Sequence, residues 1–189
     1  MPYIVFMRHA KTTLNKEGKF AGRTDCDTVP EGLEETRKNF KFKEGDFNYY
    51  YCSPLKRTQQ TLEAVLPGRK PIIDERIIER DLGEWEDKPY DEVPEPLKEK
   101  YVKGQYDPVG SESYENIRKR VCDFVSELFE KYSQNDRILV VTHAGVVRQV
   151  RDIFLPEMKK EKIKNSQLIT LTDKEYEKYM NIKNAEKIR

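Results

Sequence analysis

The chain has 189 residues, and its 35 Lys and Arg side chains nearly balance its 34 Asp and Glu side chains, so the net charge is +1. This balance argues against a nucleic-acid binder, which carries a basic excess, and against an acidic disordered chain. No apolar run approaches the roughly 20 residues of a membrane span, and the first residues lack the features of a signal peptide. We therefore expect a cytoplasmic protein with no nucleic-acid or membrane partner.

Two short apolar runs in the first third of the chain predict buried strands. Residues 3–7 (YIVFM) end abruptly at charged residues, as a buried strand does at the edge of a sheet. Residues 49–52 (YYYC) predict a second strand. Ser53 and Pro54 follow it, and because serine is a preferred helix N-cap and proline a preferred first helical residue, a helix is expected to begin there.

The rest of the chain continues this alternation. A weak strand is predicted at 71–73, and a helix at 113–133, where apolar residues recur at spacings of three and four. Residues 138–141 (ILVV) give the strongest signal for a buried strand and are followed by a short amphipathic helix. Residues 167–171 predict a late strand, and the charged tail beyond about 173 is left unassigned.

Strands that alternate with helices predict an α/β fold with helices on both faces of a sheet. The length fits a single domain over residues 1–189, since domains commonly have roughly 100–200 residues. Residues 84–112 contain four prolines and show no clear period, so we expect a lid over one end of the sheet.

The only two histidines, His9 and His143, each directly follow a predicted strand. Ligands of open α/β sheets bind outside the carboxyl ends of the strands, so both rings are expected at one edge, together with Arg8 and Arg57. Arginine forks match phosphate oxygens, and histidine is a competent nucleophile, so this set predicts a site for phosphoryl transfer.

Three other interpretations of these residues stay open at this point. A histidine at a strand end is often a hydrogen-bonded structural group, and Arg57 can belong to a solvated helix face. A metal site with His9, His143 and a carboxylate is weak, because no local ligand motif accompanies the histidines. The three widely spaced cysteines form no CxxC pair and add neither a zinc signature nor a disulfide framework.

Six segments, in order along the chain, resemble the motifs of the histidine phosphatase superfamily, also called phosphoglycerate mutase-like proteins. They are RHAKTTLN at 8–15, GRTDCDTVPEG at 22–32, CSPLKRTQQT at 52–61, ERDLGEWED at 79–87, SESYENIRKRV at 111–121 and VTHAGVVR at 141–148. The resemblance implies a three-layer sandwich with a mostly parallel central sheet. It covers most of the chain up to about residue 171.

The resemblance also implies roles for individual residues. His9 takes the phosphoryl group as a phosphohistidine, and Glu79 protonates the leaving alcohol and then activates water. A carboxyl group beside a dianionic phosphate keeps its proton more readily, which suits a general acid. The groups implied to hold the phosphate oxygens are Arg8, Asn15, Arg57, His143 and the backbone N–H of Ala144.

Three positions depart from the family pattern. The glycine after the nucleophile is Ala10, which would be strained if that position has a positive φ, and Lys11 follows where a neutral or acidic residue is usual. The glycine that closes the G-x-W-E-G element is Asp87. We expect activity to survive these changes.

The resemblance implies a phosphatase that hydrolyses a phosphate monoester of a small metabolite, similar to α-ribazole phosphatases and broad-specificity phosphatases. It implies no cofactor and no metal, and a homodimer is left open. A cofactor-dependent phosphoglycerate mutase and a non-catalytic phosphate-binding module are the alternatives. The mutase fits less well because its motif differs at ERDLGEWED and its chains are usually longer. Basic residues near the mouth of the site could favour an acidic substrate: Lys11, Lys16, Lys19, Arg23 and Lys88.

Overall fold

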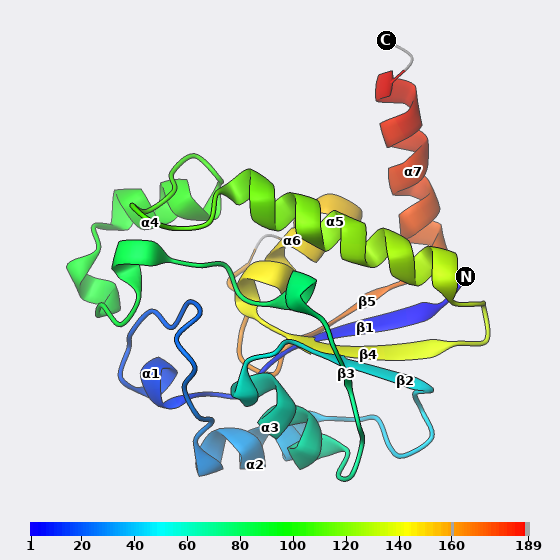
Figure 1. Cartoon of the computed structure of the whole chain (residues 1–189), viewed down its shortest axis with the longest axis horizontal. Helices are drawn as coiled ribbons and strands as arrows, with labels where there is room; N and C mark the ends of the chain where they lie inside the picture. The colour runs from blue at the N-terminus through cyan, green and yellow to red at the C-terminus, as the bar shows by residue number, and fades with distance from the viewer. Residues whose placement is uncertain (160, 188–189) are drawn as a thin grey trace.

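A five-stranded sheet forms the centre of the molecule in the computed structural model, which describes residues 1–159 and 161–187 (Figure 1). The strands are β1 (Tyr3–Arg8), β2 (Tyr49–Cys52), β3 (Ile72–Ile73), β4 (Arg137–Thr142) and β5 (Leu168–Leu171). Their order across the sheet is β3-β2-β4-β1-β5. The pairs β3–β2, β2–β4 and β4–β1 are parallel, whereas β5 is antiparallel to β1. The predicted α/β fold with a mostly parallel sheet is confirmed.

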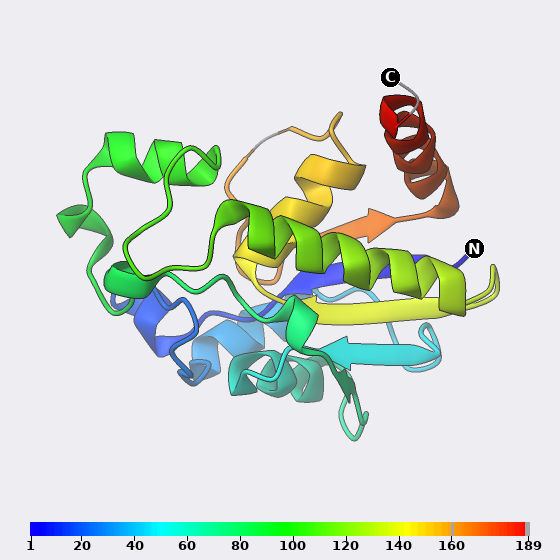
Figure 2. The same ribbon diagram turned by 45° about the horizontal axis from the view of Figure 1, so that its top comes forward.

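Helices cover both faces of the sheet (Figures 1 and 2). The helices of the described part of the chain are α1 (Thr13–Lys16), α2 (Pro30–Asn39), α3 (Lys56–Val65), α4 (Glu95–Val102), α5 (Tyr114–Lys131), α6 (Ala144–Phe154) and α7 (Asp173–Lys187). Helices α5 and α6 pack on one face, and α2 and α3 lie on the other. The three layers predicted for the fold are therefore present.

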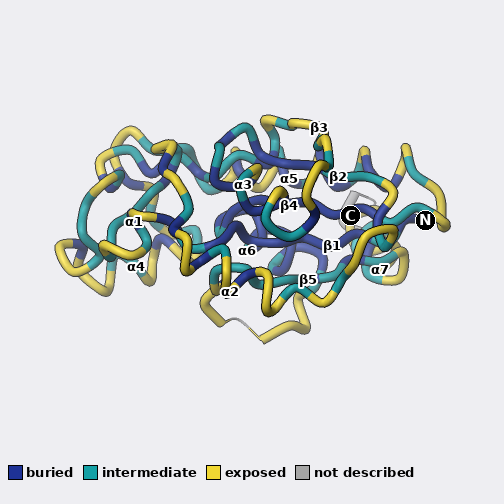
Figure 3. The backbone as a smooth tube through the Cα atoms, turned by 90° about the horizontal axis from the view of Figure 1, so that it is seen from below, coloured by how far each residue is buried: buried dark blue, intermediate teal, exposed yellow. Residues whose placement is uncertain are grey.

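The alternation of side chains along β1 explains why this strand is apolar throughout. Ile4 and Phe6 belong to the core under α5 and α6, while Val5 and Met7 belong to the core under α3. All four are buried, and Figure 3 shows β1 and β4 as a buried centre with exposed loops around it. A parallel strand that is covered on both faces has no polar side to alternate.

Helix α3 begins later than the sequence predicts. Ser53 and Pro54 do not start it, because its first residue is Lys56 and its N-cap is Leu55. The Ser53 hydroxyl lies 2.7 Å from Nε2 of His143 and also accepts from the backbone N–H of Leu55. The predicted N-cap side chain is therefore used to hold a histidine from another part of the chain.

The segment 84–112, expected to be a lid, has a small core of its own beside the end of the sheet where β1 and β4 finish (Figure 1). Trp85, Val93 and Tyr101 are buried in this core, and Phe20 packs against it. The Arg80 guanidinium lies 4.5 Å from the ring centroid of Tyr101, so a cation–π contact ties the segment to the main body.

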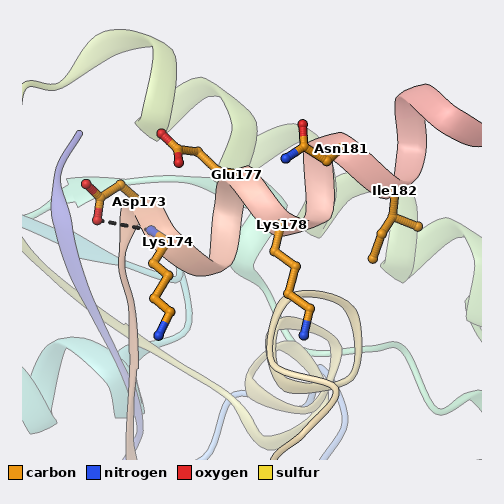
Figure 4. Close-up of a pocket in the computed structure, with 6 residues that line it drawn as sticks. All are labelled: Asp173, Lys174, Glu177, Lys178, Asn181 and Ile182. Atoms are coloured by element: carbon orange, nitrogen blue, oxygen red, sulfur yellow. Dashed lines mark hydrogen bonds between the residues drawn. The ribbon is translucent and has the colours of Figure 1, made fainter.

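Helix α7 stands at the opposite end of the sheet (Figure 1). Tyr176 stacks on Phe129 at 4.1 Å between ring centroids, which attaches the start of α7 to α5. Figure 4 shows six residues of α7 that line a pocket, and none of them belongs to the predicted site. In the described part of the chain no helix is long and apolar enough to cross a membrane.

Candidate active site

His9 lies directly after β1 and is 3% exposed. Its Nδ1 is 2.7 Å from the carbonyl oxygen of Ala10. A carbonyl oxygen only accepts, so Nδ1 carries the proton and Nε2 keeps a free lone pair. Burial, reinforced by the positive charges of Arg57 and Arg8, lowers the pKa of His9 well below its ordinary value. The ring is therefore neutral and able to act as a nucleophile at neutral pH.

His143 follows β4, and its ring centroid is 5.2 Å from that of His9. Arg57 donates from Nε to Nδ1 of His143 over 3.2 Å, so Nε2 carries the proton and donates it to the Ser53 hydroxyl. Burial and the charge of Arg57 lower the pKa of His143 well below its ordinary value. A phosphate oxygen only accepts, so one that contacts this ring would replace Ser53 as the partner of Nε2.

Arg57 is fully buried and holds the loop that contains Gly22 and Thr24. Its two terminal nitrogens donate to the carbonyl oxygens of Thr24 and Gly22, over 2.8 Å and 2.7 Å. With Nε given to His143, three of its five N–H groups are used, and two stay available for an anion. Arg57 was expected at the same sheet edge as the histidines, and it contacts one of them, His143, while its charge acts on the other, His9.

Arg8 completes the group of cations around His9. Its Nη1 donates to the carbonyl oxygen of Ile163 over 2.7 Å, while its buried Nε has no acceptor among the described residues. Burial lowers the pKa of Arg8, and the nearby positive charges of Arg148 and Arg57 lower it further. A buried donor without an acceptor is costly, and a phosphate oxygen is a suitable acceptor for it.

Glu79 lies beside the N-terminus of α6. Its two carboxylate oxygens are 3.1 Å and 3.2 Å from the backbone nitrogen of Gly145, and Oε1 also accepts from the backbone N–H of Arg80. A Cβ atom on Gly145 would lie 2.2 Å from Oε1, so this approach requires glycine. Position alone does not single out Glu79 in the sequence, because it stands in an irregular segment among many carboxylates.

Asn15 and Ala144 each keep a hydrogen-bond donor for a ligand. The Oδ1 atom of Asn15 accepts from the backbone N–H of Thr12 and from Nδ2 of Asn165, which leaves the Nδ2 group of Asn15. Ala144 is the first residue of α6, and nothing in the described chain accepts from its N–H. Backbone N–H groups at a helix start attract anions.

The departures from the family pattern behave differently from the expectation. Ala10 does not have a positive φ, so the strain considered for it is absent, and its backbone N–H donates to the Thr61 hydroxyl over 2.9 Å. Asp87, by contrast, has φ of +61°, a conformation that favours glycine. The backbone strain of the missing glycines therefore lies at Asp87.

Three further residues support the site, and the sequence analysis does not assign these roles to them. Ser53 and Thr61 bind His143 and the backbone of Ala10, and Asn165 binds the carbonyl oxygen of His9 from a loop 156 residues away. Across residues 1–159 and 161–187, no three side chains of His, Cys, Asp or Glu gather in a way that would hold a metal ion.

Comparison with known proteins identifies the family of this chain. The family model described as "Histidine phosphatase superfamily (branch 1)" matches residues 4–182. Phosphoserine phosphatase 1 of Hydrogenobacter thermophilus is 28% identical over 156 residues, which are 78% of this chain and 74% of that protein. A 2,3-bisphosphoglycerate-dependent phosphoglycerate mutase of Parvibaculum lavamentivorans is 29% identical over 182 residues, or 89% and 84% of the two chains.

Solved structures share the fold. A phosphoserine phosphatase from Entamoeba histolytica, crystallised with 3-phosphoglyceric acid, superposes with a TM-score of 0.77 at 23% identity and covers 92% of each chain. A phosphoglycerate mutase from Thermus thermophilus superposes with a TM-score of 0.74 at 23% identity, over 90% of this chain and 93% of that one. The chain therefore belongs to the histidine phosphatase superfamily, branch 1, and is an enzyme of that superfamily.

Proposed function

We propose that this enzyme hydrolyses a phosphate monoester of a small metabolite through a phosphohistidine on Nε2 of His9. The observation that carries the proposal is the state of that ring. Its Nδ1 proton is held by the carbonyl oxygen of Ala10, and its pKa is lowered by burial and by the charges of Arg57 and Arg8, so Nε2 keeps a free lone pair close to two cations. A neutral imidazole in such a place attacks phosphorus without first losing a proton.

The steps follow from the placement of the other groups. Nε2 of His9 forms a bond to phosphorus while the bond to the leaving alcohol oxygen breaks. Arg8, Arg57 and the N–H of Ala144 stabilise the negative charge on the equatorial oxygens. Glu79 gives its proton to the alcohol, and it later takes a proton from the water that attacks the phosphohistidine. This second step releases phosphate and restores His9.

The charge at the mouth supports a leaving alcohol that carries a second anion. Lys16, Lys19 and Arg23, considered above for such a role, are engaged by carboxylates of the protein. Arg148 lies one helical turn beyond Ala144, on the half-buried face of α6. Like Lys11 and Lys88, it has no carboxylate in ion-pair distance among the described residues. Its guanidinium lies 6.0 Å from the ring centroid of Tyr101 in the segment 84–112.

A partly buried cation without a partner favours an anionic ligand. We therefore propose that the substrate class is a phosphate monoester with a carboxylate or a second phosphate. The relatives named phosphoserine phosphatase and phosphoglycerate mutase support this choice, and α-ribazole phosphate, which also carries an uncharged sugar and base, becomes the less favoured substrate. The cytoplasmic location and the homodimer stay predictions.

One experiment separates phosphatase from mutase. The purified protein is incubated with O-phosphoserine, α-ribazole phosphate or 3-phosphoglycerate in the presence of a chelator, and released phosphate and isomerised phosphoglycerate are both measured. We expect phosphate release with the chelator present. Isomerisation that is faster than hydrolysis would instead favour the mutase. Phosphate release that depends completely on an added divalent ion, or no turnover of any phosphate monoester, would contradict the proposal.

A further inference from the structure

The loop that precedes β5 lies against the end of β1, although the steps proposed above make no use of it. Ser166 in this loop has φ of +60° and donates its backbone N–H to the carbonyl oxygens of Arg8 and His9, over 3.1 Å and 3.3 Å. The side chain of Asn165 donates from Nδ2 to two acceptors, the carbonyl oxygen of His9 at 3.3 Å and Oδ1 of Asn15 at 3.1 Å. One amide thus contacts both the nucleophile's backbone and an expected phosphate ligand.

The contact with His9 fixes the peptide unit between His9 and Ala10. Its carbonyl oxygen is held by Asn165 and Ser166, and its N–H is held from the other end by the Thr61 hydroxyl. The imidazole is hydrogen-bonded through Nδ1 to the next carbonyl oxygen along the chain, that of Ala10. The direction of Nε2 therefore depends on the backbone that this peptide unit fixes.

The contact with Asn15 fixes which end of its amide faces the site. Oδ1 of Asn15 receives two N–H groups, from Asn165 at 3.1 Å and from the backbone of Thr12 at 3.4 Å. Both hold the oxygen end, so the NH₂ end is turned the other way and remains a donor. A phosphate oxygen requires a donor, whereas a reversed amide would present a carbonyl oxygen and repel it.

We propose that Asn165 is a positioning residue, which directs Nε2 of His9 towards phosphorus and the NH₂ group of Asn15 towards the phosphate oxygens. This inference rests on the proposed function. It differs from a role in holding the loop alone, because it predicts an effect on phosphate that passes through Asn15.

Inorganic phosphate is the probe for the contact with Asn15, and its affinity is measured by calorimetry for each variant. Asn165→Ala should weaken phosphate binding about fivefold, the size of one lost neutral hydrogen bond. Asn165→Asp, nearly the same shape, should weaken it further because its carboxylate would face two acceptor oxygens. In an Asn15→Ala background, Asn165→Ala should change the affinity by less than about twofold, since the two residues act as one unit.

The control is Gln167→Ala in the same loop. The Gln167 side chain accepts from the backbone N–H of Lys164 over 2.8 Å and holds the loop from within. This variant should bind phosphate like the unaltered protein. Equal weakening by Gln167→Ala and Asn165→Ala, or a full fivefold effect of Asn165→Ala in the Asn15→Ala background, would overturn the role through Asn15.

The contact with His9 is tested by the rate of the first p-nitrophenolate burst at saturating p-nitrophenyl phosphate. Asn165→Ala should slow this burst even in the Asn15→Ala background, and an unchanged burst rate would remove His9 from the proposal. Thermal unfolding checks that each variant is folded, and Asn165→Asp replaces Asn165→Ala should the latter not fold. Phosphate binding needs no turnover, so a protein that binds phosphate as predicted but hydrolyses nothing would refute the proposed function and leave the positioning of Asn15 standing.

Discussion

Replacing Gly145 by alanine should reduce catalysis without reducing stability. A Cβ atom at this position would lie 2.2 Å from Oε1 of Glu79, whereas an ordinary contact begins at 3.4 Å, so the carboxyl group must move by about 1.2 Å. That oxygen is the far end of a flexible side chain, so it can move at small cost. Alanine is also better than glycine in a helix, by roughly 0.5–1 kcal/mol in the interior and by less at Gly145, which is the second residue of α6. We expect the free energy of unfolding to stay the same or to rise.

The effect on catalysis should depend on the leaving group. General acids contribute about 10²–10⁴-fold, and a misplacement of about 1 Å costs roughly 100-fold. An alkyl phosphate such as O-phosphoserine needs a proton on its leaving oxygen, so its kcat/KM should fall about 100-fold in Gly145→Ala. p-Nitrophenolate leaves without a proton, so the kcat/KM of its phosphate should fall less than about tenfold.

The assay is a comparison of kcat/KM for the two substrates, accompanied by urea unfolding of both proteins. Equal losses for the two substrates would show that Glu79 is not the acid that protonates the leaving group. A large loss of stability would show that Gly145 serves the packing of α6 rather than the approach of Glu79.

Three further predictions concern stability and specificity. Because burial lowers the pKa of both histidines, the unfolded chain takes up protons below about pH 6.5 that the folded chain does not. The free energy of unfolding in urea should therefore fall by up to about 2.7 kcal/mol per pH unit between pH 6.5 and pH 5. A flat profile would contradict this. The free energy of unfolding of Asp87→Gly should be about 1 kcal/mol higher than that of Asp87→Ala. Both variants lose the exposed contact with Lys19, but only alanine is strained at positive φ. Equal stabilities in the same denaturant assay would argue against strain at this position. Arg148→Met should lower kcat/KM about tenfold for O-phosphoserine and leave kcat/KM nearly unchanged for phosphoethanolamine, which lacks the carboxylate. Equal changes in kcat/KM for the two substrates would show that Arg148 does not recognise the carboxylate.

The central part of the fold could be predicted from the sequence because it depends on local patterns. β1 and β4 are covered on both faces, so they appear as uninterrupted apolar runs, and α5 has one apolar face of regular period. The sequence does not predict helix α7, because the helix is mostly charged and only a few of its residues, among them Tyr176, pack on the core. A helix stabilised by so few contacts leaves little periodic signal in its sequence.

The site was predictable where position along a strand determines it. His9 and His143 follow neighbouring parallel strands, and the ends of such strands meet at one edge, so their approach to within 5.2 Å of each other follows from topology. Asn165 is not predictable from the sequence, because it lies in an irregular loop and its partner, the carbonyl oxygen of His9, is 156 residues away in the chain. Ser53 directly follows β2, which pairs with β4, so the same topology brings its hydroxyl to His143. Ser53 also has the local pattern of a helix cap, which was the wrong interpretation of its hydroxyl.

The formation of a phosphohistidine on His9 is the central claim, and trapping it is the most direct test. The protein is mixed with a ³²P-labelled phosphate monoester, quenched in alkali within the first turnover, digested and analysed for the labelled peptide. We expect an acid-labile, base-stable label on the peptide that contains His9, and no label on His9→Ala, while His143→Ala is labelled more slowly at the same position. Label on any residue other than His9, or a labelled His9→Ala protein, would contradict the account.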